Sequence, residues 1–291
     1  MGRGRIATMP FLTASFFSTL LSVTILSGSV SAETPVERGS YLVNTVMSCQ
    51  NCHTPKGPTG DIAEKAFSGG LSWDEPPFKV TASNITQDKI TGIGNWTAAQ
   101  LKSFLVTGVR PNGVPVAPLM PTGYYKILVP ADLDAIVAYL RTIEPIRNEV
   151  PNPEYRAPMA QEVLPGAEKP ANPAGFNDKV KRGFYLATIA HCMECHTPMD
   201  RGRHLFATSL GKGGQEFPGP WGKSVSRNIT SDKAAGIGAW SDGEIKRAIT
   251  QGIARDGTRL KPPMGYGYYA RMTDADVDAI IAWLRTVPPK S

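Results

Sequence analysis

The chain has 291 residues, a formal net charge of +6 and four cysteines. Two of the basic residues, Arg3 and Arg5, lie in an N-terminal segment that resembles a removable leader, so the net charge says little about binding partners. Nothing in the sequence supports nucleic-acid binding.

Residues 1–32 have the layout of a secretory signal peptide. Arg3 and Arg5 give a positive start, residues 11–26 are mostly apolar, and Val30-Ser31-Ala32 has the small residues of a cleavage site. An uncleaved membrane anchor is the alternative, but serines and threonines interrupt the apolar stretch, which is short for a membrane span. We therefore expect a periplasmic protein with no membrane span after cleavage.

Apolar periodicity predicts a helix over residues 36–47, which leads into Cys49-Gln50-Asn51-Cys52-His53. This C-x-x-C-H pentapeptide is the attachment signature of c-type haem. Residues at i, i+3 and i+4 share one helix face, so Cys49 and Cys52 would form thioethers to the haem and His53 would ligate its iron. Zinc binding and dithiol redox chemistry are the alternatives.

Two more helices are expected before residue 145. Thr97 and Gln100 form a capping-box pair that starts a middle helix, which ends near Gly108. Apolar residues at i, i+3, i+4 and i+7 predict a closing helix over residues 130–140, with Pro130 in its first turn. No segment alternates enough to predict a strand, so the expected fold class is all-α.

Between these helices lies Met120, in the sequence Pro118-Leu119-Met120-Pro121. The iron of a haem held by His53 has one axial position left, and a methionine there closes the site and raises the reduction potential. We expect Met120 to be this ligand because its prolines favour a rigid loop. Packing in the core is the alternative for any methionine.

Residues 145–175 contain seven prolines without a clear apolar period and are expected to form a semi-rigid linker. After it the first unit recurs at an offset of 144 residues, or 143 at the haem motif. We place the one-residue changes in loops, where chain length varies easily. The repeat predicts two domains, residues 33–144 and 176–291.

The second copy supplies Cys192, Cys195 and His196 as the second haem attachment motif, and Met264 as its expected axial methionine. The chain then has no cysteine left over. His191 and His204 have no counterparts in the first unit. One of them would make a bis-histidine site, although surface or core packing suits both better. A carbonyl near Gly69 is expected to accept the Nδ1 proton of His53.

The two units resemble the class I cytochrome c fold, and particularly the diheme cytochromes c related to cytochrome c subunits of bacterial membrane-bound alcohol and gluconate dehydrogenases. The likeness rests on motifs written in both units: R-G-x-Y-L, C-x-x-C-H-T-P, N-I-T-x-D, G-I-G-x-W, the methionine loop and the closing helix. It implies two tandem cytochrome c domains, each around a covalent haem c. It also implies that Trp96 and Trp240 donate toward a haem propionate, with core packing as the alternative.

Two irons closed by His and Met ligands predict an electron-transfer protein rather than an enzyme. We expect a periplasmic or membrane-bound dehydrogenase as electron donor and a cytochrome or oxidase as acceptor. A diheme cytochrome c peroxidase is the alternative, but it would need halves that differ around the distal ligand. A non-enzymatic subunit permanently docked to a catalytic partner is a further possibility.

Overall fold

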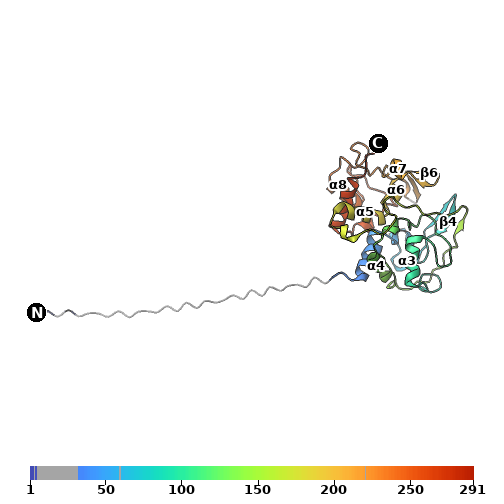
Figure 1. Ribbon diagram of the computed structural model, residues 1–291, viewed down its shortest axis with the longest axis horizontal. Coiled ribbons are helices and arrows are strands. Elements are labelled where there is room, and N and C mark those ends of the chain that lie inside the picture. Colours follow the sequence, from blue (N-terminus) through green and yellow to red (C-terminus); the bar gives the residue numbers. More distant parts are fainter. Residues whose placement is uncertain (3, 5–31, 59, 220) are drawn as a thin grey trace. The chain divides into compact units, whose positions relative to one another are not determined.

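The computed structural model describes residues 1–2, 4, 32–58, 60–219 and 221–291 (Figure 1). The predicted signal peptide, residues 1–32, falls almost wholly outside these residues. Residues 33–291 form one compact unit. Among the described residues, no helix combines the length and the apolar character needed to cross a bilayer. The prediction of two separate domains stays a prediction, and we call residues 33–144 the first half and residues 176–291 the second half.

The helices of the first half follow the expected order. They are α1 Pro35–Tyr41, the π-helix η1 Leu42–Val46, α2 Gln50–His53, the 3-10 turn η2 Ala63–Lys65, α3 Ala98–Thr107, the 3-10 turn η3 Tyr124–Ile127 and α4 Pro130–Leu140. The capping box of Thr97 and Gln100 is formed, and Gly108 ends α3 with φ 71°. The predicted middle and closing helices are therefore confirmed.

The second half repeats this arrangement. Its helices are α5 Lys179–Ile189, α6 Cys192–His196, α7 Phe206–Ser209, α8 Asp242–Gln251, α9 Tyr266–Tyr269 and α10 Asp274–Leu284. Ser241 and Glu244 form the capping box of α8, and the Thr273 side chain caps α10. In each half the first helix packs against the closing helix, α1 on α4 and α5 on α10.

The prediction of an all-α fold was wrong, because the chain also forms several small antiparallel sheets and its fold is mixed. The strands are β1 Lys56–Gly57, β2 Gly60–Asp61, β3 Ser72–Glu75, β4 Phe78–Thr81, β5 Glu154–Tyr155, β6 Met199–Asp200, β7 Arg203–His204, β8 Glu216–Gly219 and β9 Gly222–Val225. Each has two to four residues, which is too short for alternation to be visible in a sequence. Tight turns rich in glycine and proline bring these short segments together.

The linker is less detached from the halves than its prolines suggested. Its strand β5 pairs with β4, which aligns Phe78 with Tyr155. The 3-10 turn η4 spans Pro173–Gly175 near its end. Ala171 donates its backbone N–H to the Ile127 carbonyl at 2.9 Å, and Leu164 is fully buried. Residues 145–175 therefore pack along the compact unit.

The one-residue changes in repeat spacing lie in helical turns, not in loops as expected. Before the first haem motif, the π-helix η1 occupies the place that α-helical α5 fills in the second half. A π-turn adds one residue without breaking the helix. After the motifs, the three-residue η2 corresponds to the four-residue α7. Both changes keep the motif and the hairpin that follows it in equivalent places.

Two close helix crossings depend on glycine. A Cβ added at Gly39 would lie 1.9 Å from the Ala135 carbonyl oxygen, and one at Gly183 would lie 1.9 Å from that of Ala279. Real Cβ atoms do not approach so closely, so any side chain would push α1 from α4 and α5 from α10. The shared R-G-x-Y-L motif therefore has a packing role.

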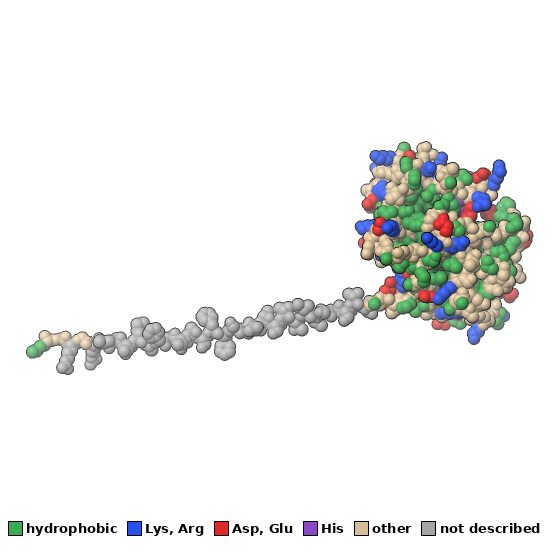
Figure 2. Space-filling view, in the orientation of Figure 1, with side chains coloured by type: hydrophobic (Ala, Val, Ile, Leu, Met, Phe, Trp, Pro, Cys, Tyr) green, Lys and Arg blue, Asp and Glu red, His purple; other side chains and the backbone are tan. Residues whose placement is uncertain are grey.

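The halves contact each other through a reciprocal pair of hydrogen bonds. Tyr41 of the first half donates to Asp276 at 2.6 Å, and Tyr185 of the second half donates to Asp132 at 2.6 Å. These residues are equivalent in the repeat, so the contact has approximate two-fold symmetry. Figure 1 shows the blue-to-green first half beside the orange-to-red second half. On the face in Figure 2, hydrophobic side chains gather centrally among charges of both signs.

Candidate haem sites

Each C-x-x-C-H motif forms a short helical turn entered through a left-handed residue. Ser48 has φ 47° and His191 has φ 46°, and these residues directly precede Cys49 and Cys192. The His53 backbone N–H donates to the Cys49 carbonyl at 2.9 Å, which closes one turn and places the motif's ends on one face. All four cysteines are free thiols and partly accessible. The donor set is therefore two thiols and one imidazole in each half.

The histidine rings are held by carbonyl oxygens in both halves. The Nδ1 atom of His53 lies 2.7 Å from the Ser83 carbonyl, and that of His196 lies 2.6 Å from the Arg227 carbonyl. The acceptor expected near Gly69 is the Ser83 carbonyl, whose carbon would lie 2.8 Å from a Cβ at Gly69. With Nδ1 engaged, Nε2 is the ring atom left for an axial bond. Burial also lowers the pKa of both imidazoles, which favours the neutral form that ligates iron.

Gly69 has another role at this site. Its backbone N–H donates to the His53 carbonyl at 2.7 Å, and Gly213 does the same for His196. Gly69 has φ 84°, and a Cβ there would lie 2.4 Å from the Ala82 carbonyl. The glycine lets the segment ending in Ser83 approach the histidine, which is why a carbonyl reaches Nδ1.

Burial raises the pKa of the thiols, to about 12 for Cys49, about 11 for Cys52 and about 12 for Cys192. At neutral pH, with no metal bound, these groups are protonated thiols. Among the described residues, no three His, Cys, Asp or Glu side chains gather as a metal cluster. The further Cys or His partners that a zinc site would need are therefore missing beside either motif in the described part of the chain.

The two motifs lie close to each other. The pKa of Cys195 is raised mainly by burial, then by the charges of Glu194, Cys192 and Cys52, the last of which belongs to the first half. The pKa of Tyr125 in the first half is likewise raised mainly by burial, and then by the charges of Cys49, Glu194 and Cys52. The contact between the halves therefore brings the two motifs into one neighbourhood.

Met120 and Met264 are partly buried and pack against the hydrophobic core. Trp96 and Trp240 are also partly buried, and Trp96 meets Phe104 edge-on with ring centroids 5.3 Å apart. The roles assigned to these four residues stay predictions.

Sequence reasoning missed the arginine that anchors each tryptophan. Arg141 donates to the Trp96 carbonyl, and Arg285 donates to the Trp240 carbonyl at 2.5 Å. These arginines follow the closing helices at equivalent positions, so the repeat itself offered a means of finding them. Each fixes the tryptophan's backbone to the end of a closing helix.

Three polar side-chain atoms are buried without a partner among the described residues: Thr122 Oγ1, Tyr124 Oη and Arg247 Nε. The pKa of Tyr124 is raised by burial and then by Glu194, Glu162, Cys195 and Cys192, so this phenol lies beside the second motif. Buried donors normally find acceptors. The unpaired Tyr124 hydroxyl beside free thiols fits a group that carries both reactive edges and acceptor oxygens, as haem does.

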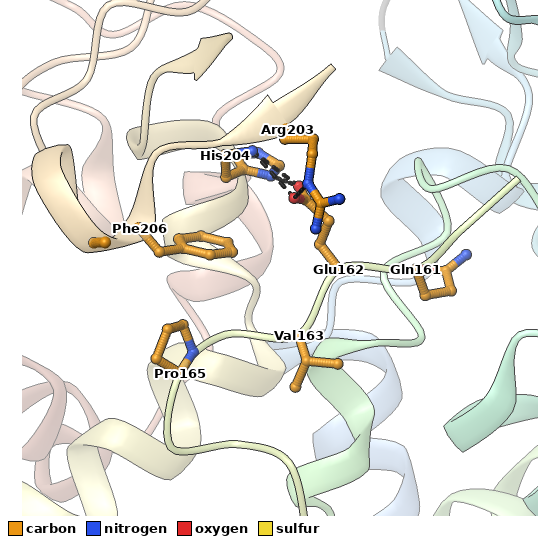
Figure 3. A pocket seen from close by; sticks show the side chains of 8 residues that line it. Gln161, Glu162, Val163, Pro165, Arg203, His204 and Phe206 are labelled. Atoms are coloured by element: carbon orange, nitrogen blue, oxygen red, sulfur yellow. Dashed lines mark hydrogen bonds and ion pairs between the residues drawn. The ribbon is translucent and has the colours of Figure 1, made fainter. Parts of the chain in front are cut away.

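His204 is occupied in a different way from an iron ligand. Its Nδ1 lies 2.5 Å from Glu162 Oε2 of the linker, and its Nε2 lies 2.7 Å from the Glu194 carbonyl within the second motif. The ring also stacks on Phe206. Figure 3 shows Glu162 pointing at His204 and Arg203 across a pocket of about 340 Å³. Both nitrogens are engaged, so the pair ties the linker to the second motif.

Comparison with known proteins agrees with this geometry. The Cytochrome c family profile matches residues 180–288. A diheme cytochrome c-type protein from Cereibacter sphaeroides is 31% identical over 252 residues, which cover 82% of this chain and 82% of that protein.

Subunits of larger enzymes are also similar. The cytochrome subunit of fructose dehydrogenase from Gluconobacter japonicus is 31% identical over 270 residues, which are 88% of this chain and 53% of that subunit. The cytochrome c subunit of gluconate 2-dehydrogenase from Pantoea cypripedii is 28% identical over 93% of this chain and 63% of that subunit. The chain thus spans between about half and two thirds of the length of these two dehydrogenase subunits.

Proposed function

The chain belongs to the diheme cytochrome c family, and from this premise we propose that it carries electrons between two haems c bound at Cys49, Cys52 and His53 and at Cys192, Cys195 and His196. The family implies covalently bound haem c and its iron. One observation carries the assignment: two equivalent turns each present free thiols and an imidazole whose Nδ1 is held by a carbonyl. We assign Met120 and Met264 as the second axial ligands.

Haem supplies an iron that accepts and releases one electron, and the residues of this chain set how readily it does so. The Ser83 and Arg227 carbonyls accept the Nδ1 proton of each histidine, which fixes the tautomer and makes Nε2 a stronger donor. A weak thioether and a buried setting both favour the reduced state. Closure of each iron by two protein side chains leaves no position for a substrate.

The nearness of the two motifs supports transfer within the molecule. Asn51 of the first motif donates to the Pro263 carbonyl beside Met264 at 3.1 Å, so groups assigned to the two haems meet across the halves. Since each motif fixes one edge of its haem, we propose that the two macrocycles are neighbours. An electron that enters through one half then reaches the other without leaving the protein.

We propose that the protein is exported to the periplasm and that its electron donor is a periplasmic or membrane-bound dehydrogenase, with a cytochrome or oxidase as acceptor. Support comes from relatives named as cytochrome subunits of fructose and gluconate dehydrogenases. One measurement distinguishes a diffusing carrier from a permanently docked subunit. Co-elution with a dehydrogenase from a native extract at high salt identifies a docked subunit.

A redox titration followed by absorption spectra tests the central proposal. Two haems per chain, both low-spin in the reduced protein, are expected, with two resolvable potentials. Met120→Ala and Met264→Ala should each convert one haem to high spin and lower its potential, by on the order of 0.1 V. One haem per chain, or a reduced high-spin haem that binds carbon monoxide readily, would contradict it.

A further inference from the structure

Two side chains of the first half, Asn51 and Asp61, hydrogen-bond the loop that carries Met264 and the turn after it, and no equivalent pair of bonds reaches the Met120 loop among the described residues. We propose that Asn51 and Asp61 of the first half are positioning residues for Met264, so that the ligation of the second haem depends on the first half. The inference rests on the proposed function, in which Met264 ligates the second iron. It concerns how that ligand is kept in place.

The first contact joins one haem motif to the other methionine loop. Asn51, between Cys49 and Cys52, donates its side-chain amide to the Pro263 carbonyl at 3.1 Å. Pro263 directly precedes Met264 in the chain. The bond therefore fixes the backbone that carries the thioether, and its donor belongs to the turn that attaches the first haem.

The second contact holds the helical turn after Met264. Tyr268 of α9 donates to Asp61 Oδ2 at 2.5 Å, and Lys56 lies 3.2 Å from the same hydroxyl while pairing with Asp61. The Lys56 ammonium also lies 5.8 Å from the centroid of the Tyr268 ring. Strand residues of the first hairpin thus clamp the Tyr268 side chain, four residues beyond Met264.

Two further bonds extend the clamp toward α10. Arg271 donates to the Asn44 carbonyl at 2.5 Å, and the Thr273 backbone N–H donates to the Tyr41 hydroxyl at 3.2 Å. Together these contacts hold the segment from Pro263 to Thr273 at several points. The methionine lies near one end of a segment that the other half keeps in place.

The bonds to Pro263 and Tyr268 have no equivalents around Met120 in the described residues, where the second half makes an aromatic contact instead: the Tyr124 ring meets Phe206 edge-on with ring centroids 6.4 Å apart. Glu194 replaces Asn51 in the second motif, and a carboxylate has no proton to donate to a loop carbonyl. Tyr124, the counterpart of Tyr268, has a buried hydroxyl without a partner. Its loop is approached instead by the linker, where the Gln161 amide lies 3.3 Å from the Val116 carbonyl. The hydrogen bonds from Asn51 and Asp61 are therefore specific to the Met264 side.

A hydrogen bond of this kind changes an equilibrium constant by about fivefold. Removing the Asn51 or Asp61 contact should therefore shift the second haem about fivefold toward loss of Met264. The first haem should be affected less, because neither side chain hydrogen-bonds His53 or Met120 among the described residues. Asp61→Asn is the cleaner variant in this respect, since Asp61 lies outside the turn that attaches the first haem.

The experiment uses the full diheme protein in its ferric state. Axial methionines give one paramagnetically shifted methyl resonance per haem, and Met120→Ala and Met264→Ala assign the two signals. Asn51→Ala and Asp61→Asn are then compared with Asn95→Ala. The control removes an amide that donates to the Lys89 carbonyl within the first half, at 2.7 Å.

The expected result is that Asn51→Ala and Asp61→Asn each weaken the Met264 signal more than the Met120 signal and lower the second potential more than the first, whereas Asn95→Ala changes neither signal. Wild-type behaviour of both clamp variants, or equal weakening of the two methionine signals, would overturn the positioning role while leaving the proposed function intact. If Met264→Ala removes no signal, the proposed ligation fails and this inference fails with it. If Asn51→Ala lowers the yield of folded protein, Asp61→Asn alone still tests the positioning role.

Discussion

The first and second halves contain equivalent helical segments in the same order, yet several of their contacts with other parts of the chain differ. In the first half the hairpin of β3 and β4 is widened by the linker strand β5. In the second half β8 pairs with β9, and no third strand joins them among the described residues. The comparison shows that the repeat sets the haem-binding frame, while the contacts between segments make the halves unequal.

The methionine loops show the same principle at the sites themselves. The Met264 segment is clamped by polar groups of the first half, whereas Tyr124 near Met120 is left with a buried unpaired hydroxyl. Histidine support is nearly identical, with Nδ1 contacts of 2.7 Å and 2.6 Å. We therefore expect any difference between the two haems to come from the distal side.

The largest effect is expected when the covalent attachment of one haem is lost, because only one half then keeps a haem site to compare. Cys49→Ala with Cys52→Ala should leave one haem per chain, and Cys192→Ala with Cys195→Ala should do the same for the other half. The core of the altered half should also lose stability, because its haem no longer adds apolar surface. Haem content per chain and thermal unfolding measure both results. Two haems in either double variant would contradict the assignment.

The close helix crossings predict the next largest effect. Gly39→Ala and Gly183→Ala should each destabilise the protein by about 3 kcal/mol, because the new methyl would overlap a backbone carbonyl that cannot move away alone. Equal costs would show that the halves share one packing solution. Urea unfolding of the haem-loaded protein measures them. Gly243→Ala, at an exposed position of α8 where nothing lies within 4 Å of the new Cβ, is the control and should cost little.

Removing the hydroxyl of each reciprocal tyrosine should destabilise the protein by a smaller amount, which differs between the two halves. Tyr185 is 1% exposed, and Tyr185→Phe leaves the buried Asp132 with Arg38 as its remaining partner, at a cost of about 2 kcal/mol. Tyr41→Phe should cost about 1 kcal/mol because that residue is only partly buried. Denaturant unfolding again measures the change. A larger loss for Tyr41 than for Tyr185 would show that burial does not rank these bonds.

The smallest expected effect is a pH dependence. Burial and the bond to Asp276 raise the pKa of Tyr41 to about 12, above the value of about 10 in an unfolded chain. A raised pKa of an acid means that the contribution is fully present below about pH 10 and is lost as the pH rises toward about 12. The stability advantage of the native protein over Tyr41→Phe should therefore shrink across that range. An advantage that stays constant would argue against protonated Tyr41 as the donor.

Much of the haem-binding frame could be predicted from local sequence. The capping boxes at Thr97 and Ser241 and the closing helices formed as expected, because each depends on residues a few positions apart. The short strands escaped because hairpins of two to four residues leave too few positions to show a period. Their pairing depends on turns rather than on side-chain pattern.

Contacts between the halves were beyond local reasoning. The bond from Tyr41 to Asp276 joins residues 235 positions apart, and nothing near either residue announces it. The carbonyl that holds His53 was expected near Gly69 but not identified as that of Ser83, since any backbone carbonyl can accept and only the folded path selects one. The sequence did show that equivalent tyrosines, aspartates and arginines occur in both units. That recurrence did not show that each tyrosine bonds to the aspartate of the other half.

The crossing tyrosines carry a consequence for assembly. Since each half offers the same donor and the same acceptor, one unit of this sequence is complementary to a copy of itself, as in the interface of a symmetric dimer. Joining both units in one chain replaces an encounter between molecules by one within a molecule, where the effective concentration reaches the millimolar range. The linker thereby makes docking of the units independent of protein abundance, and pairs every first unit with a second unit whose loop it is shaped to hold.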